Sequence, residues 1–135
     1  MATTDRKLEL TNQHPMSIVF RFPAVSLSRE VFEATLSMPV DRFEPSKDGP
    51  LSYAQIDVPE DGDAWASAAT IAERLGPATT ASVERGEMGQ PWADIAVSFL
   101  DDRMTTSLFI PSTFALVLGR WGFQIEVSVY LTSPD

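Results

Sequence analysis

The stretch VPEDGDAW, residues 58–65, places three carboxylates within four residues, Glu60, Asp61 and Asp63. Such groups can hold a divalent metal or act as a catalytic acid and base. A calcium loop needs acids at alternating positions, then a glycine and a distant glutamate, whereas here Gly62 separates the two aspartates. A catalytic pair needs two environments that move the two pKa values apart, and a solvated loop offers neither. The spacing therefore predicts no metal site and no catalytic pair.

The same carboxylates suit the start of a helix. Asp63 can accept a hydrogen bond from a backbone N–H of the first turn, while Glu60 and Asp61 lie near the positive end of the helix dipole. This capping role leaves room for recognition, because residues 51–63 contain four acids and no base. A second acidic turn joins them if both loops lie at one end of the sheet. We expect a docking surface for a basic partner at Asp57, Glu60, Asp61, Asp63, Asp101 and Asp102.

Three tryptophans raise the alternative of an aromatic-lined ligand site. Trp65 and Trp121 belong to apolar stripes with helical spacing and are expected in the core. Trp92 instead begins a strand on its less apolar side. The alternative ligand site on this wet face of the sheet consists of Tyr53, Trp92, Asp94 and Tyr130.

Few other residues could carry chemistry. The single histidine, His14, lies in a polar N-terminal segment where nothing would orient it for catalysis. The chain has no cysteine, which excludes disulfides, thiolate metal sites and a cysteine nucleophile. None of its seven glycines forms a phosphate-binding loop. We therefore expect no catalytic residue, no metal and no cofactor.

Composition limits the partners. The 135 residues suit one domain, and the net charge of −9 is concentrated in residues 51–135, which carry four bases and twelve acids. Nucleic acids and anionic membranes would be repelled at long range. No segment has the apolar length of a signal peptide or a spanning helix, so a cytoplasmic location is expected.

Alternation of apolar and polar residues predicts the strands, and 3.6-residue spacing predicts the helices. Gly76 and Pro77 are expected to end the second helix, with residues 78–86 left open for another turn or two. Residues 40–51 contain two prolines and a glycine without periodicity and are expected to form a surface loop. The predicted strands cover residues 16–22, 52–58, 91–100, 105–110 and 123–131, and the predicted helices begin near residues 28, 64 and 112.

The order of elements predicts the fold class. Most strands have one apolar and one polar side, which is typical of a sheet covered by helices on one face. We expect an α+β two-layer sandwich of roughly ferredoxin-like character, with a mostly antiparallel sheet in which residues 91–100 and 105–110 form a hairpin. Residues 1–14 are expected to form a flexible arm, and residues 15–135 a single domain.

The segments WASAATIAERLGP, PWADIAVSFL and SLFIPSTFALVLGRWGFQIEVSVYL follow one another as helix, strand, helix and closing strand. In this order and pattern the chain resembles the DUF4279 family of small bacterial proteins over residues 17–131. The resemblance implies the same fold and a bacterial origin. That family has no agreed catalytic residues, so the resemblance implies no active site.

These observations favour a non-enzymatic binding protein that occludes a basic protein partner, such as a toxin or a defence protein. It would then be an immunity or inhibitor protein of bacterial or phage origin. One alternative is a small-molecule binding module on the wet face of the sheet. Another is an enzyme whose carboxylates Asp57, Asp94 or Glu126 converge there. A homodimer is also open, because the closing strand can pair with a second copy if it lies at the edge of the sheet.

Overall fold

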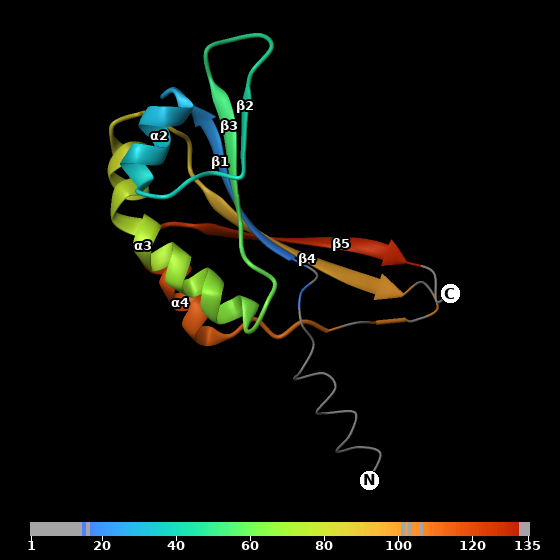
Figure 1. Cartoon of the computed structure of the whole chain (residues 1–135). Helices are drawn as coiled ribbons and strands as arrows, with labels where there is room; N and C mark the ends of the chain where they lie inside the picture. Colours follow the sequence, from blue (N-terminus) through green and yellow to red (C-terminus); the bar gives the residue numbers. More distant parts are fainter. Residues whose placement is uncertain (1–14, 16, 101, 103, 106, 133–135) are drawn as a thin grey trace.

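The computed structural model describes residues 15, 17–100, 102, 104–105 and 107–132 (Figure 1). These residues form three helices and five strands. In chain order the elements are β1 (Ser17–Val25), α2 (Arg29–Leu36), β2 (Arg42–Pro45), β3 (Ser52–Asp57), α3 (Ala64–Glu84), β4 (Trp92–Leu100), α4 (Ser112–Arg120) and β5 (Gln124–Thr132).

The strands form one sheet in the order β2-β3-β1-β4-β5. Its pairs are antiparallel except β4 and β5, which run parallel because α4 carries the chain back between them. Figure 1 shows α2, α3 and α4 on the same side of the sheet. The predicted class, an α+β fold with a mostly antiparallel sheet and helices packed on it, is confirmed. We call the side of the sheet without helices the open face.

The core lies between the helices and the sheet. Burial alternates strictly from Ser17 to Phe22 of β1, with Ile18, Phe20 and Phe22 each at most 1% exposed. Aromatic rings pack in this core in edge-to-face pairs, a favoured geometry for aromatic side chains. The pairs are Phe20 with Phe123, Phe22 with Phe32, and Trp65 with Phe114.

Residues 40–51 contain a strand, β2, where the sequence predicted only a surface loop. Within them β2 pairs with β3 over four residues, from Arg42 opposite Gln55 to Pro45 opposite Ser52. The loop prediction was wrong there because main-chain pairing with an existing strand needs no apolar periodicity. Pro45 fits because a strand at the edge of a sheet can lack an N–H on its outer side.

The predicted end of α3 at Gly76 and Pro77 was also wrong, since the helix continues to Glu84. Pro77 removes one intrahelical hydrogen bond, but buried Leu75 and Ser82 hold the helix to the core on both sides of it. Gly76 has a packing role instead, because the ring of Trp121 lies where a side chain would begin. Residues that normally end helices are therefore used inside one.

The predicted hairpin after β4 is not present in the described residues. Of residues 101–110, those that the structure describes form no strand, and the two neighbours of β4 are β1 and β5. β5 pairs with β4 along nine residues, from Trp92 opposite Gln124 to Leu100 opposite Thr132. The edge of β4 that the hairpin would have used is thus occupied by β5.

The closing strand was predicted correctly in position. Phe123, just before it, is buried, but the apolar residues that follow on the same side are exposed. The reason is visible in Figure 1, where β4 and β5 extend well beyond the helices as an arm. The exposed residues are Ile125, Val127, Val129 and Leu131.

Candidate functional site

The loop between β3 and α3 holds the carboxylates that the sequence singled out. Asp63 caps α3, as predicted: its Oδ1 accepts hydrogen bonds from the backbone N–H groups of Trp65 at 3.1 Å and Ala66 at 3.2 Å. Gly62 makes the turn before it with a φ of 74°, a conformation that glycine adopts without strain. The turn and the cap fix the direction in which the chain enters the helix.

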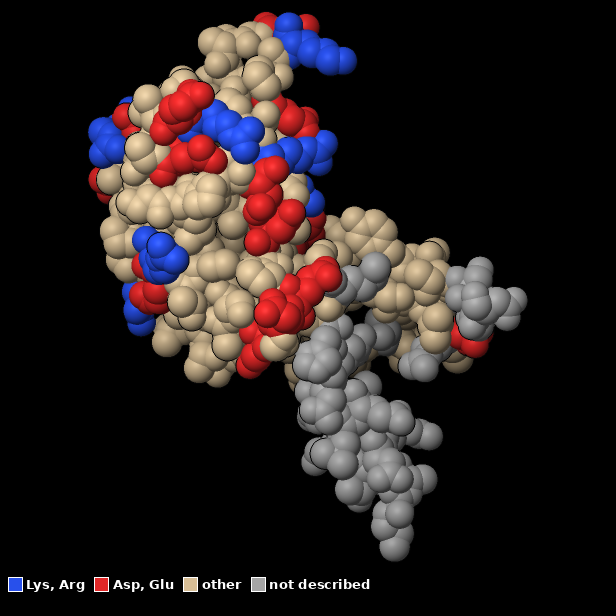
Figure 2. Space-filling model, in the orientation of Figure 1, with Lys and Arg blue, Asp and Glu red and all other residues tan. Residues whose placement is uncertain are grey.

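The acids of this loop point to solvent. Asp57, Glu60, Asp61 and Asp63 are all exposed. Asp41, from the segment before β2, joins them, because its Oδ2 accepts a hydrogen bond of 2.7 Å from the backbone N–H of Asp57. Figure 2 shows acidic side chains gathered on this side of the molecule. We call the set the acidic loop surface: Asp41, Asp57, Glu60, Asp61 and Asp63.

None of the ion pairs found among the described residues uses an acid of this surface. Five arginines form ion pairs, and each pair uses an acid outside the set. The acids used are Glu33, Glu44, Glu73, Glu87 and Asp94. The acidic loop surface therefore keeps its charge available for a group from another molecule.

A cavity of about 270 Å³ lies beside the acidic loop surface. Ile18, Val58 and Pro59 give it apolar walls, and Glu60 is the acid among the residues that line it. Lysine and arginine side chains combine a long apolar stem with a charged end. The cavity suits such a side chain, with the stem against the walls and the charge at Glu60.

The second acidic turn does not join this surface. Asp102 is exposed and follows β4, whose end lies at the tip of the arm, away from the loop before α3 (Figure 1). Asp101 lies outside the described residues. The sequence predicted one surface only if both acidic loops lay at the same end of the sheet, and Asp102 does not lie at the end where the loop before α3 lies.

On the open face, a polar network surrounds Arg21. Its guanidinium donates to Asp94 Oδ2 from Nε at 3.1 Å and from Nη2 at 2.9 Å, and it also bonds the Tyr53 hydroxyl. Asp94 is only 6% exposed, and its Oδ1 accepts a 2.6 Å hydrogen bond from Ser128. Burial by itself would lower the pKa of Arg21, but the hydrogen bonds to Tyr53 and Asp94 raise it above its ordinary value.

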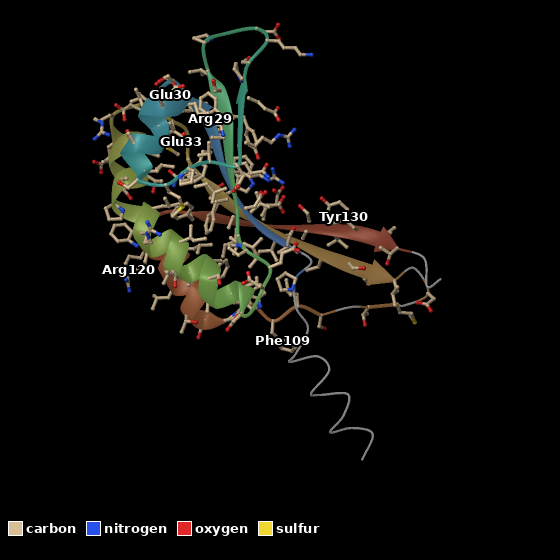
Figure 3. The ribbon with its side chains drawn as sticks, in the orientation of Figure 1. Arg29, Glu30, Glu33, Phe109, Arg120 and Tyr130 are labelled. Carbon is tan, nitrogen blue, oxygen red and sulfur yellow. The ribbon has the colours of Figure 1, made fainter. Side chains whose placement is uncertain are left out.

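This network brings together two of the four residues predicted for a ligand face. Arg21 joins Tyr53 to Asp94, whereas Trp92 turns its indole N–H to Glu126 Oε1 at 3.0 Å. Tyr130 lies on the arm (Figure 3), and its side chain is half exposed. Tyr53 and Asp94 are thus linked through a cation that the prediction did not include.

The three carboxylates considered for an enzyme lie in one row across the open face. Val19 of β1 is opposite Asp57 on one side and Asp94 on the other, and Asp94 is opposite Glu126. Each already has a partner: Asp57 accepts from Gln55, Asp94 from Arg21, and Glu126 from Trp92. The row is held by hydrogen bonds to its neighbours.

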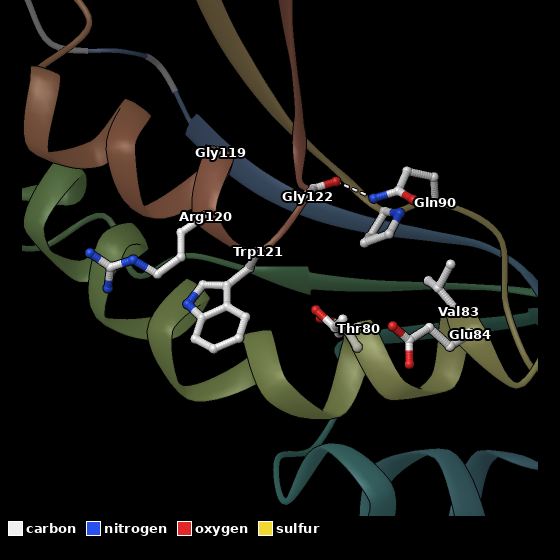
Figure 4. A pocket seen from close by; sticks show the side chains of 10 residues that line it. Thr80, Val83, Glu84, Gln90, Gly119, Arg120, Trp121 and Gly122 are labelled. Atoms are coloured by element: carbon white, nitrogen blue, oxygen red, sulfur yellow. Dashed lines mark hydrogen bonds between the residues drawn. The ribbon is translucent and has the colours of Figure 1, made fainter.

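Another opening lies where the end of α4 meets α3 (Figure 4). This cavity of about 360 Å³ is lined by Trp121, Glu84 and Gln90, among others. Thr80 also lines it, and its buried hydroxyl has no hydrogen-bond partner. Arg120 at its margin pairs with Glu73 at 2.6 Å, outside the acidic loop surface.

The remaining predictions concern tryptophans, histidine and metals. Trp65 is buried in the core and Trp121 is half-buried against it, as predicted. His14 and the rest of residues 1–14 lie outside the described residues. Among those that are described, no three potential metal ligands come close enough to hold an ion.

Comparison with family models, with curated proteins and with solved structures found no match. The resemblance to the DUF4279 family therefore stays a prediction. In the described part of the chain, no helix combines the length and the apolar character needed to cross a bilayer.

Two residues of these sites were missed from the sequence. Arg21 stands on the polar side of an otherwise apolar strand, which is a signal that could have placed it on the open face. Asp41 lies in a segment predicted as a loop, and only the pairing of β2 with β3 brings it to Asp57. No local pattern indicates that contact.

Proposed function

We propose that this protein is a non-enzymatic binding protein that docks a basic protein partner on its acidic loop surface and thereby occludes it. The observation that carries the proposal is the set of exposed acids from Asp41 to Asp63 that share no ion pair with the described arginines. Clustered charge of one sign accelerates encounter with a partner of opposite charge and penalises wrong partners. An immunity or inhibitor protein that neutralises a basic toxin or defence protein would use such a surface.

The cavity beside Glu60 adds a specific binding pocket to the negative charge of the acidic loop surface. Interfaces are held by a few side chains that fill pockets, with a polar rim around them. The cavity beside Glu60 can receive one lysine or arginine stem, while Asp57 and Asp61 are exposed to meet further bases. The partner is accordingly expected to present a protruding base within a positively charged face.

The open face supports a small-molecule module less well. Arg21 donates to Asp94, Tyr53 and Gln55, and Tyr53 in turn donates to Gln55. A ligand would therefore have to break existing hydrogen bonds to gain new ones. Leaving buried polar groups without partners costs about 1–3 kcal/mol each. On the acidic loop surface, Glu60 and Asp61 are exposed and are in none of the hydrogen bonds of the described residues, so a partner can bind them without breaking any.

The test uses two variants of equal net charge. One neutralises the site by Asp57→Asn, Glu60→Gln and Asp61→Asn. The control neutralises three exposed acids elsewhere by Glu30→Gln, Asp48→Asn and Glu84→Gln. Each protein is immobilised and used to capture partners from a lysate of the native host at low salt, and the captured basic protein is purified and assayed with the wild-type chain.

The proposal expects a basic protein that the wild type and the control retain, that the site variant loses, and whose own activity falls when the wild type is added in equal amount. Capture by all three proteins alike, or a captured protein whose activity does not change, would overturn it. Because the attraction is electrostatic, binding should weaken as salt rises.

A further inference from the structure

The two edges of the sheet are built differently. At one edge, β2 has four residues, carries exposed Arg42 and Glu44, and ends at Pro45. Short length, charge and proline all discourage pairing with another chain. At the other edge, β5 has nine residues, of which Glu126 is the only charged one. The β5 edge is long, has no proline and has a single charge, so it has little of the protection that β2 has.

The main chain of β5 is open to a partner on its outer side. Gln124 donates its N–H to the carbonyl of Pro91 at 3.2 Å, so the main-chain groups of Gln124 point toward β4. Main-chain groups of a strand alternate between its two edges. Those of Ile125, Val127, Val129 and Leu131 therefore point outward, and in the described part of the chain no strand pairs with them.

The side chains of these four residues are also uncovered. Their exposed fractions rise along the arm, from 39% for Ile125 and 43% for Val127 to 56% for Val129 and 71% for Leu131. Tyr130, 51% exposed, lies between the last two on the opposite side of the strand (Figure 3). A contiguous apolar edge of this kind marks an interaction site.

We propose that a second copy of this chain covers this edge, with the two β5 strands antiparallel about a twofold axis at Ser128. Ser128 is the middle residue of Gln124–Thr132, so this register pairs the whole strand with its copy. Val127 then lies opposite Val129 of the second copy, and Ile125 opposite Leu131. Every outward N–H and C=O of these residues gains a partner.

The charges fit the same register. Glu126 lies opposite Tyr130 of the second copy, so no like charges face each other across the new pair. A twofold interface must be complementary to itself. The apolar residues of β5 satisfy this condition, because each meets another apolar residue in the copy, and the result is one sheet that continues through both subunits.

The first test reads the register with cysteines, because the chain contains none of its own. Ser128→Cys places two thiols in a non-hydrogen-bonded pair with Cα atoms about 4.5 Å apart, within reach of a disulfide. Tyr130→Cys is the matched control, since its two copies are displaced by about 13 Å along the strands. Mild oxidation should give a covalent dimer of the first variant within minutes and little of the second.

The second test measures association by sedimentation equilibrium. The variant Val127→Lys/Val129→Lys sets lysines opposite each other at the centre of the interface and should raise the dissociation constant about a hundredfold or more. Val31→Lys, on half-exposed Val31 of α2, is the control and should leave it unchanged. Circular dichroism confirms that each variant is folded.

The dependence of binding on salt concentration distinguishes the dimer from the proposed docking of a basic partner. Two copies that each carry −9 repel each other, so the dimer should strengthen as salt rises, whereas docking of a basic partner should weaken. A wild type that stays monomeric at high salt and high protein concentration would overturn the dimer and leave the acidic loop surface untouched. Equal cross-linking of Ser128→Cys and Tyr130→Cys would overturn the register.

Discussion

Asp94 and the acids of the loop before α3 are the same kind of group in opposite surroundings. Asp94 is almost fully buried on the open face, where Arg21 and Ser128 satisfy both of its oxygens. Glu60 and Asp61 are exposed, and no arginine of the described residues pairs with them. In the first arrangement a carboxylate holds β4 to β1 and β5, and in the second the carboxylates are free to bind another molecule. Their responses to mutation should differ accordingly.

The largest effect is expected from removing the cation beside Asp94. Arg21→Met leaves a buried carboxylate without its ion pair and should lower the free energy of unfolding by about 3 kcal/mol. This is the low end for buried pairs, because the Arg21 side chain remains 27% exposed. Urea denaturation measures the loss.

The matched variant replaces both partners. Arg21→Met with Asp94→Leu removes the stranded charge and should recover much of the stability, since apolar pairs of similar volume substitute well for buried ion pairs. A double variant as unstable as Arg21→Met alone would mean that the stranded carboxylate is not the cause.

The second effect concerns binding. With an oligolysine peptide as the basic probe, the variant Asp57→Asn/Glu60→Gln/Asp61→Asn should bind about tenfold more weakly at low salt, which corresponds to about 1.4 kcal/mol. The control Glu30→Gln/Asp48→Asn/Glu84→Gln has the same net charge and should lose much less. Isothermal titration compares the two. Equal losses would show that the probe senses only the total charge.

Replacing Asp63, the capping residue of α3, should have a smaller effect, and that effect should be on folding stability. Asp63→Ala removes the acceptor for two backbone N–H groups and should cost about 1 kcal/mol of stability. Asp63→Asn keeps a good cap without the charge and should cost only a few tenths of that amount. Thermal unfolding of the two variants separates the cap from the charge.

The smallest effect is expected at Asp61. Because it is exposed and none of the described ion pairs includes it, Asp61→Asn should change the free energy of unfolding by less than about 0.5 kcal/mol. At low salt the change should be a slight gain, since neutralisation relieves repulsion from neighbouring acids. A loss above 1 kcal/mol would mean that Asp61, like Asp94, stabilises the fold.

The sequence predicted the elements that carry a strong local pattern. The alternation in β1 and β5, the helical spacing in α2 and α4, and the cap at Asp63 each depend on neighbours a few residues away. Local propensity and tertiary packing agree at these positions. The α+β class followed from their order alone.

What the sequence missed depends on distant contacts. Gly76 and Pro77 indicate a helix end locally, but α3 continues to Glu84 because residues on both sides of them are buried in the core. The space beside Gly76 is filled by Trp121, far along the chain. β2 forms because its main chain pairs with the edge of β3, and that pairing also brings Asp41 to Asp57. The exposure of β5 has the same origin, since periodicity shows that a strand has an apolar side but not how far the helices reach to cover it.

The central place of β1 has a consequence for synthesis of the chain. Phe20 of this first strand pairs with Ile56 on one side and with Ala93 on the other. During translation β1 is therefore synthesised long before β4, its second neighbour. Its apolar side chains cannot be fully covered until the residues beyond 92 have been added. Until then the nascent chain exposes the apolar side chains and unpaired edge of an incomplete sheet, the features that make partly folded chains prone to aggregate.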